Sequence, residues 1–388
     1  MMANLATLDF IRHHADDDVR QLALQGAKWP DVDMRYALDQ IAGRQKARVK
    51  LPSWAAIDGI VYPPHLSMEQ CSSEQTACYK ARLAGEGGLF VDLTAGFGVD
   101  AAFIAKGFKR AVTVERQQQL CDIASQNYRT LGLGHIETVC GDGVDYLHSL
   151  QRADLIFVDP ARRDEHGART YGLADCTPNI LEIVDEMAEK ACRVMIKLSP
   201  MLDWQKAVAD VGRVGEVHIV SVGNECKELL LMVSKEPEPL HVYCVNDGSV
   251  FDFEPQLPVG ASAVSCAAPR YLYEPNASVM KAGCFDLLSE RYQMPQLDRN
   301  SHLFVSEAYV TDFPGRCFEI ERVLSMNKRQ LKEGLGDIKK ANITVRNFPM
   351  TVVALRQRLR LQEGGDTYIF ATTVAKTGHQ LFVCRKKS

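Results

Sequence analysis

Short apolar runs alternate with amphipathic stretches through the middle of the chain. Seven of these runs are rich in β-branched and aliphatic residues and predict strands: Leu89–Leu93, Ala111–Glu115, Ile136–Cys140, Asp154–Asp159, Arg193–Leu198, Glu216–Val222 and Leu229–Ser234. The segments between the first five runs are long enough for crossover helices, as over Gln117–Leu131 and Pro178–Lys190. Near-continuous apolar strands that alternate with helices are typical of a parallel sheet covered on both faces.

The connection between the last two predicted strands is much shorter than the others. Only residues 223–228 separate them, and a segment of this length cannot hold a crossover helix. We therefore expect an antiparallel last strand on an otherwise parallel sheet. The predicted fold class is α/β, with a Rossmann-like sheet at its centre.

The region before residue 86 has a helical pattern instead. Apolar residues recur at helical spacing, as in Leu5, Leu8 and Ile11. The segment Ser67–Gln70 resembles a capping box that would open another helix toward Leu83. We therefore expect an N-terminal helical region.

Two smaller units are expected beyond a linker of Lys, Glu and Pro at residues 235–239. In the second of them, the pattern predicts two helices and three strands: Asn327–Leu335 and Met350–Leu359, then Ile343–Asn347, Tyr368–Thr373 and Gln380–Cys384. We divide the chain into four parts: an N-terminal helical region (1–85), the Rossmann-like domain (86–235), a small α+β domain of ferredoxin-like type (236–310) and a basic C-terminal α+β domain (311–388).

Composition agrees with several packed cores. With 388 residues, of which 46% are apolar and 24% charged, the chain is longer than one ordinary globular domain. No apolar stretch approaches the roughly 18 residues that span a bilayer, and the N-terminus lacks the pattern of a signal peptide. The twelve cysteines include no Cys-x-x-Cys pair. We therefore expect no membrane insertion, no metal site and a cytoplasmic location.

Charge is distributed unevenly along the chain. Residues 316–388 hold 15 Lys and Arg against 6 Asp and Glu, a local balance of +9, whereas the first 315 residues carry −13. A basic segment in an acidic chain favours an anionic partner, for which nucleic acid is the usual example. A solvated basic face is the alternative interpretation.

A glycine-containing segment follows the first predicted strand and precedes a helix. It runs from Asp92 to Asp100 and contains, in order, Thr94, Ala95, Gly96 and Gly98. Glycines in such a turn let the backbone approach a ligand closely and leave N–H groups free to bind it. The spacing also fits a dinucleotide fingerprint, and a tight turn without any ligand is a further interpretation.

Polar residues follow the next strands at the same edge of the predicted sheet. Glu115 ends the second strand, where a carboxylate can accept hydrogen bonds from ribose hydroxyls, and Asp142 follows the third, placed for an adenine amino group. Asp159 and Pro160 end the fourth strand, and Lys197 lies at the end of the fifth. Because open α/β sheets bind ligands at the carboxyl ends of their strands, these residues predict one site.

The charge of this edge discriminates between two cofactors. S-adenosylmethionine (AdoMet) carries a sulfonium and an ammonium against one carboxylate, whereas NAD carries a pyrophosphate. An edge with Asp92, Asp100, Glu115, Asp142 and Asp159 favours the cationic ligand on Coulomb grounds. We therefore predict AdoMet as the cofactor and disfavour a nicotinamide oxidoreductase.

The segment from Leu89 to about Ser234 resembles the class I AdoMet-dependent methyltransferases. The resemblance implies a cofactor site formed by Asp92, Thr94, Ala95, Gly96, Gly98, Asp100, Glu115 and Asp142. The loop is especially similar to that of small-subunit ribosomal RNA guanine-N2 methyltransferases. More fully, the chain resembles bacterial methyltransferase-like proteins with a C-terminal THUMP-like domain, on the residues Tyr271–Asn276, Gly315-Arg316 and 364–384. Since THUMP domains bind RNA in tRNA-modifying enzymes, this resemblance implies an RNA partner.

The residues after the fourth strand depart from the family pattern. Amino-directed methyltransferases place an acidic or amide residue, two prolines and an aromatic ring here, and these hold the target amino group. Asp159 and Pro160 match this pattern, whereas Ala161 replaces the second proline and Arg162 replaces the ring. We predict Asp159, Pro160 and Arg162 as the catalytic residues.

Three nearby residues leave alternatives open. Tyr171 is a candidate for the missing ring. Arg162 and Arg163 would either hold a phosphate or pair with the two acidic residues that follow them. Lys197 is either a cleft residue or an ordinary surface lysine.

The sequence thus predicts direct methyl transfer from AdoMet to a nucleobase nitrogen in rRNA or tRNA. Asp159 would orient the acceptor and accept its proton, and the basic C-terminal domain would bind RNA phosphates. Two alternatives remain: a methyltransferase that acts on a protein or small molecule, and an RNA-binding protein with a non-catalytic AdoMet site.

Overall fold

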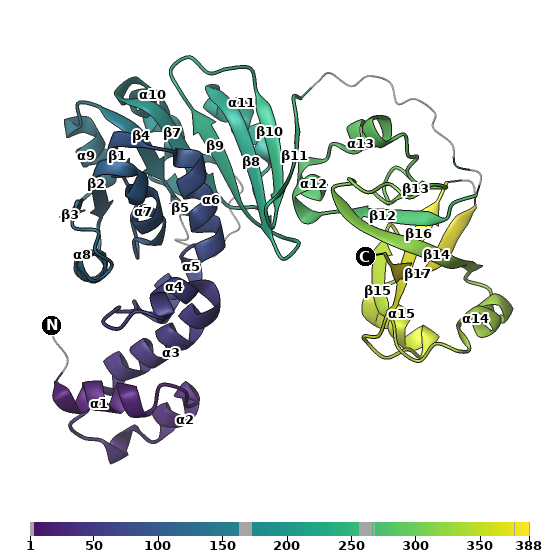
Figure 1. Ribbon diagram of the computed structural model, residues 1–388, viewed down its shortest axis with the longest axis horizontal. Helices are drawn as coiled ribbons and strands as arrows, with labels where there is room; N and C mark the ends of the chain where they lie inside the picture. Colours follow the sequence, from purple (N-terminus) through teal and green to yellow (C-terminus); the bar gives the residue numbers. More distant parts are fainter. Residues whose placement is uncertain (1–3, 163–172, 256–265, 267, 376, 388) are drawn as a thin grey trace. The chain divides into compact units, whose positions relative to one another are not determined.

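The computed structural model describes residues 4–162, 173–255, 266, 268–375 and 377–387. The chain divides into two compact units (Figure 1). The first unit comprises residues 1–222 and 227–241, and the second comprises residues 223–226 and 242–388. Among the described residues, no helix is both long enough and apolar enough to cross a membrane.

The first unit begins with helices, as the apolar spacing predicts: α1 (Leu5–His13), α2 (Val19–Leu24), α3 (Met34–Lys50), α4 (Pro52–Ala55), α5 (His65–Gln70) and α6 (Glu74–Ala84). The expectation of one helix running from Ser67 toward Leu83 is wrong. The backbone of Cys71 is extended and ends α5, because an extended residue cannot continue helical hydrogen bonding. The next helix is capped by Ser73, whose hydroxyl accepts a hydrogen bond from Thr76 N at 3.3 Å.

The seven predicted strands are neighbours in one sheet, in the order β8-β9-β7-β4-β1-β2-β3. They are β1 (Gly87–Asp92), β2 (Phe108–Glu115), β3 (Ile136–Cys140), β4 (Ala153–Val158), β7 (Ala191–Leu198), β8 (Val214–Val222) and β9 (Glu225–Val233). The neighbouring pairs β7–β4, β4–β1, β1–β2 and β2–β3 are parallel, whereas β9 is antiparallel to β7, as predicted. Gly223 and Asn224, both with φ of 59°, form the two-residue turn between β8 and β9.

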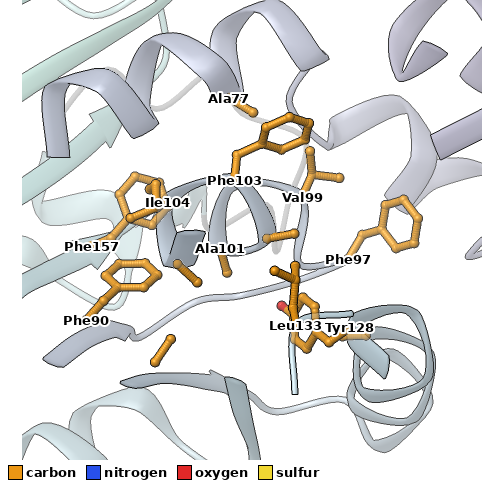
Figure 2. Packing of buried hydrophobic residues seen from close by; sticks show 14 of the residues in the cluster. Ala77, Phe90, Phe97, Val99, Ala101, Phe103, Ile104, Tyr128, Leu133 and Phe157 are labelled. Atoms are coloured by element: carbon orange, nitrogen blue, oxygen red, sulfur yellow. The ribbon is translucent and has the colours of Figure 1, made fainter. Parts of the chain in front are cut away.

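Helix α7 (Val99–Ile104) packs between α6 and the sheet, with all of its residues buried. Figure 2 shows Phe103 of this helix facing Ala77 of α6, and Ile104 facing Phe157 of β4. Burying a side chain of this size stabilises the fold by about 1.5–3 kcal/mol. This layer fixes the end of the loop that follows β1. The remaining helices of the first unit are α8 (Gln118–Thr130), α9 (Gly143–Ser149), α10 (Ile180–Lys190) and α11 (Trp204–Val211).

The second unit contains a mixed sheet in the order β13-β12-β14-β17-β16-β15. Its strands are β12 (Tyr271–Pro275), β13 (Phe304–Ser306), β14 (Gly315–Ser325), β15 (Asn342–Arg346), β16 (Thr367–Val374) and β17 (Gly378–Lys386). Its helices are α12 (Ala277–Ala282), α13 (Phe285–Tyr292), α14 (Lys328–Leu335) and α15 (Val352–Leu359), and β10 (His241–Asn246) and β11 (Ser249–Phe253) form an antiparallel hairpin. The two helices and three strands predicted for the C-terminal region are confirmed.

Strand β14 is not predicted by the sequence pattern. A shift in its pairing with β17 between Ile320 and Arg322 interrupts the alternation of its side chains, so apolar positions do not follow a period of two. β14 also pairs with β12, and residues on both sides of position 311 therefore share one sheet.

Candidate active site

The loop after β1 is held tightly on one side and open on the other. Gly96 and Gly98 have φ of 55° and 84°, in the left-handed region that favours glycine. A Cβ atom on Gly98 would lie 2.2 Å from the hydroxyl oxygen of Tyr128 in α8, so a larger residue would have to displace that ring. Beside Gly96, by contrast, no heavy atom lies within 4 Å of the position of a Cβ atom. The backbone at Gly96 can therefore be approached closely by a ligand.

Asp92 is the most buried of the predicted carboxylates, with 1% of its surface exposed. Its Oδ1 accepts a hydrogen bond from Thr94 N at 2.9 Å. Burial raises the pKa of Asp92 well above its ordinary value, and the negative charges of Asp100, Asp159 and Glu115 act in the same direction against that hydrogen bond. A cation bound nearby would relieve this repulsion, whereas a pyrophosphate would increase it.

Glu115 and Asp142 lie at the ends of the next two strands. The carboxylate of Glu115 accepts a hydrogen bond from Gly96 N at 2.9 Å, which ties β2 to the loop. Asp142 caps α9 by accepting from Val144 N at 2.7 Å, and it forms an ion pair with Arg116. Although burial raises the pKa of Asp142, the bonds from Val144 and Arg116 outweigh burial and lower it below the ordinary value.

Asp159 follows β4 and is held at two points. Its amide donates to Thr94 Oγ1 at 2.7 Å, and its Oδ2 lies 2.5 Å from Nζ of Lys197. The side chain of Lys197 is only 13% exposed, so this residue is not an ordinary surface lysine. The two contacts fix both the backbone and the carboxylate of Asp159.

The predicted arginines are only partly described. The backbone of Arg162 belongs to the short strand β5 (Ala161–Arg162), which pairs antiparallel with β6 (Cys176–Thr177). The side chain of Arg162, together with Arg163 and Tyr171, lies outside the described residues. Their predicted roles therefore stay predictions.

Asp100 is surrounded by residues that sequence reasoning missed. Its carboxylate accepts a hydrogen bond from Ser72 Oγ at 2.7 Å and lies 3.2 Å from Nζ of Lys80. Lys80 is fully buried and also donates to both carboxylate oxygens of Glu228, at 2.6 and 2.7 Å. The available signal was a lysine on the buried face of α6, in line with Ala77. The cofactor contact predicted for Asp100 stays a prediction.

A cavity of about 830 Å³ brings the predicted residues together. Its volume lies within the range of roughly 300–1,000 Å³ that is usual for ligand pockets. The predicted residues that line it are Asp92, Thr94, Ala95, Gly96, Gly98, Asp100, Glu115, Asp142, Asp159 and Pro160. The N-terminal helical region adds Ser67, Gln70, Cys71 and Ser72, which were not predicted as site residues. Among the described residues, no group of three His, Cys, Asp or Glu side chains is placed to hold a metal ion.

A solved structure is similar to the chain over almost its whole length. The crystal structure of a "putative methyltransferase" from Porphyromonas gingivalis W83 has 31% sequence identity and a TM-score of 0.85, and the match covers 99% of this chain and 98% of that chain. The chain belongs to this methyltransferase family. None of the curated proteins compared with the methyltransferase matches it.

Family models match three parts of the methyltransferase. They are a THUMP-like domain over residues 315–386, a ferredoxin-like domain over 271–314, and protein-L-isoaspartate(D-aspartate) O-methyltransferase over 83–164. The chain is an AdoMet-dependent methyltransferase with a THUMP-like domain at its C-terminus, which confirms the predicted fold class, enzyme class and cofactor.

Two other solved structures are similar to a smaller part of the methyltransferase. An rRNA methylase from Streptococcus thermophilus has 19% identity and a TM-score of 0.32, covering 42% of this chain and 95% of that chain. TrmK of M. capricolum, in complex with S-adenosylhomocysteine, has 15% identity and a TM-score of 0.33, covering 42% of this chain and 69% of that chain.

Proposed function

We propose that this enzyme transfers the methyl group of AdoMet to a nucleobase nitrogen of RNA, with rRNA or tRNA as the acceptor. The observation that carries the proposal is the position of Asp159 and Pro160 after β4, in the lining of the cavity that also contains the loop from Asp92 to Asp100. A carboxylate in that position can orient an acceptor N–H. The twelve cysteines, none in a Cys-x-x-Cys pair, suit a reducing compartment such as the cytoplasm.

The cavity has the chemistry that AdoMet requires. The open backbone beside Gly96 would accommodate its methionine part, Glu115 would accept hydrogen bonds from the ribose hydroxyls and Asp142 one from the adenine amino group. The buried carboxylate of Asp92 would favour its positive charge. When bound, AdoMet supplies an activated methyl group on a sulfonium centre.

Asp159 and Pro160 would position the acceptor nitrogen. In the reaction a bond forms between this nitrogen and the methyl carbon, the bond from that carbon to sulfur breaks, and S-adenosylhomocysteine leaves with the electron pair. The carboxylate of Asp159 accepts a hydrogen bond from the acceptor N–H and takes the proton that the methylated nitrogen releases. Positioning of the acceptor by fixed groups lowers the barrier, because the entropy of orientation is lost before the reaction begins.

RNA binding is assigned to the basic C-terminal region. Residues 316–388 have a local charge balance of +9, and the THUMP-like family model covers 315–386. Lys and Arg contacts to phosphates give affinity without sequence preference, so binding would weaken steeply with salt.

A protein acceptor is the second candidate. It is favoured by the family model of protein-L-isoaspartate(D-aspartate) O-methyltransferase, which matches residues 83–164. This match covers the cofactor loop and ends before β7, so it leaves the basic C-terminal region unexplained. We therefore rank the RNA acceptor first.

Methylation of RNA from two strains tests the proposal. The purified enzyme is incubated with tritiated AdoMet and total RNA, either from a strain without the gene or from its parent. We expect label in the RNA of the deletion strain and little in the RNA of the parent, where the site is already methylated. Mass spectrometry of nucleosides then identifies the base. Label confined to protein, or two RNA samples with equal nucleosides, would overturn the RNA assignment.

A further inference from the structure

Five charged side chains alternate in sign between the interior of the first unit and the cavity. In order they are Glu228, Lys80, Asp100, Lys197 and Asp159, and we term them the buried ion-pair series. The closest nitrogen–oxygen distances along it are 2.6, 3.2, 3.9 and 2.5 Å. The series draws on α6, α7, β7, β9 and the end of β4.

Exposure in the series increases toward the cavity. The side chains of Glu228 and Lys80 are 3% and 0% exposed, those of Asp100 and Lys197 are 10% and 13% exposed, and that of Asp159 is 37% exposed. An isolated charge at the inner positions would cost several kcal/mol. Lys80, Asp100 and Lys197 each lie between charges of opposite sign, and Asp159, which lines the cavity together with Asp100 and Lys197, is the most exposed member.

Stability alone is a weak reason for such a series. A buried ion pair can often be replaced by apolar residues of similar volume without loss of stability, because desolvation offsets most of the Coulomb attraction. The series ends on the carboxylate that is proposed to orient the methyl acceptor. A role in holding that carboxylate explains why charged residues occupy the interior.

Lys197 is the member that contacts Asp159 directly. Burial lowers the pKa of Lys197, but the charges of Asp159, Asp100 and Glu228 outweigh burial and raise it above the value of a free lysine. The ammonium holds Oδ2 of Asp159, while Thr94 holds the amide of Asp159. Because the ammonium contacts Oδ2, Oδ1 of this 37% exposed side chain can accept a hydrogen bond from an acceptor N–H.

We propose that Lys197 is a positioning residue that fixes the carboxylate of Asp159 toward the methyl acceptor, and that Glu228, Lys80 and Asp100 hold Lys197 in that place. The inference rests on the proposed function, because it concerns the carboxylate that would orient the acceptor. It adds Lys197, which lies outside the predicted catalytic motif, to the site. It also gives a role to Lys80, which belongs to the N-terminal helical region. Displacing a reacting group by about 1 Å can cost about 100-fold in rate.

A double-mutant cycle in the full-length enzyme tests this role. The variants are Lys197→Met, Asp159→Asn and the two combined, and the control is Lys206→Met on α11, whose side chain is 63% exposed. Tritiated AdoMet is used with an extract of the deletion strain that is separated into RNA and protein, so the acceptor is not presupposed. Affinity for AdoMet and the melting temperature are measured for every variant.

The expected result is a large loss of turnover in each single variant, and these losses should not add in the double variant. Lys197→Met should lower kcat about 100-fold with little change in the affinity for AdoMet, and Lys206→Met should behave as the wild type. If Lys197 acts through Asp159, the double variant loses no more than Asp159→Asn alone. Lys197→Arg, which keeps the charge, should recover part of the loss.

A variant farther along the series tests whether the inner residues hold Lys197 in place. Glu228→Gln keeps the shape of the side chain and removes one charge that flanks Lys80. We expect a smaller loss of kcat, about 10-fold, in a protein that still binds AdoMet. An unaltered kcat in a folded Glu228→Gln protein would overturn the part of the proposal that concerns the inner residues.

The two proposals can fail separately. If label enters protein and not RNA, the proposed function fails, while the cycle on the protein fraction still decides the role of Lys197. Unchanged kcat in Lys197→Met, or a double variant whose loss equals the product of the single losses, would overturn the positioning role. If neither fraction is labelled by the wild type, both proposals are overturned.

Discussion

Two aspartates at the edge of the sheet that would hold the cofactor have pKa values shifted in opposite directions. Asp92 is buried and its pKa is raised by that burial, whereas Asp142 is half-buried, and its hydrogen bond from Val144 and its ion pair with Arg116 lower its pKa. Surroundings rather than residue type therefore decide which carboxylate gains most from a cation. Asp92 has the most to gain, because burial and the negative charges of Asp100, Asp159 and Glu115 all disfavour its ionised form.

Loss of AdoMet binding is expected when either of two edge carboxylates is removed. Asp92→Ala and Glu115→Ala should each weaken AdoMet binding by about 100-fold or more, because one loses the buried charge and the other the hydrogen bond to Gly96 N. Calorimetry with AdoMet measures the effect. Asp122→Ala, an exposed change on α8 outside the cavity lining, serves as the control. Wild-type affinity in both test variants would refute the assignment.

Asp154 offers a test of stability away from the cavity. Its Oδ2 accepts hydrogen bonds from Leu89 N and Gly88 N, at 2.8 and 2.7 Å, and these bonds lower its pKa. Because the folded-state pKa is lowered, this stabilisation is complete above the unfolded value of about 4 and disappears as pH falls through the lower folded value.

Asp154→Asn should therefore reduce the free energy of unfolding by about 1 kcal/mol at neutral pH and by much less in acid. Urea unfolding at a series of pH values measures the difference. The control is Asp122→Asn. In the wild type, the carboxylate of Asp122 accepts a hydrogen bond from the Gln118 side chain on the surface of α8. A loss in Asp154→Asn that does not change with pH would contradict the argument.

At the scale of elements, the loop between β1 and α7 contains one glycine packed against a side chain and one glycine with open space beside it. Both have positive φ, but only Gly98 is close to a side chain, the hydroxyl of Tyr128. The tight packing of the loop on α8 and its openness to the cavity therefore depend on different residues. Substituting each in turn separates the two properties.

Alanine at the two positions should have unequal effects on stability. Gly98→Ala combines a strained φ with a contact of 2.2 Å and should cost about 2–4 kcal/mol, whereas Gly96→Ala has the strained φ alone and should cost about 1 kcal/mol. Chemical denaturation measures both. Equal losses would show that the contact with Tyr128 relaxes without cost.

The elements differ in how far the sequence predicts them. The seven strands of the first sheet are predicted because buried parallel strands are continuous apolar runs. β14 is not predicted, since the shift at Ile320 and Arg322 breaks its alternation. The edge carboxylates and the glycine loop are predicted from strand ends, but the pair of Lys80 and Glu228 is not, because 148 residues separate its members and only the tertiary fold brings them together.

At the scale of the whole molecule, the acidic and basic parts of the sequence fall largely in different units. The basic residues from 316 onward belong to the second unit, whose sheet also contains β12 and β13. Deleting residues 317–388 would remove most of that sheet, Phe318 and Phe370 included, and would expose Leu272, Leu303 and Val305, which pack in the same cluster. Reversing exposed charges tests RNA binding without this damage.

Reversal of two exposed charges should reduce the salt dependence of RNA binding. Lys339→Glu with Lys340→Glu removes two exposed positive charges from the second unit. If both contact phosphates, the slope of log affinity against log salt falls by about 1.5, since each contact contributes about 0.7–0.9. Filter binding at several salt concentrations measures the slope. The charge-matched control, Lys109→Glu with Lys206→Glu in the first unit, should leave the slope unchanged. Equal slopes in the wild type and both double variants would argue against RNA contact by Lys339 and Lys340.

The location of Lys80 in α6 has a consequence for any attempt to shorten the enzyme. A fragment that starts at residue 86 would retain Asp100 and Glu228 but lose the ammonium that lies 3.2 and 2.6 Å from them. Glu228 would then lose its ion pair, and Asp100 would keep only the more distant ammonium of Lys197 at 3.9 Å, at a cost of several kcal/mol. The helices that precede the sheet are thus not a detachable appendage, and an excised Rossmann-like core should be recovered only as insoluble or unfolded protein.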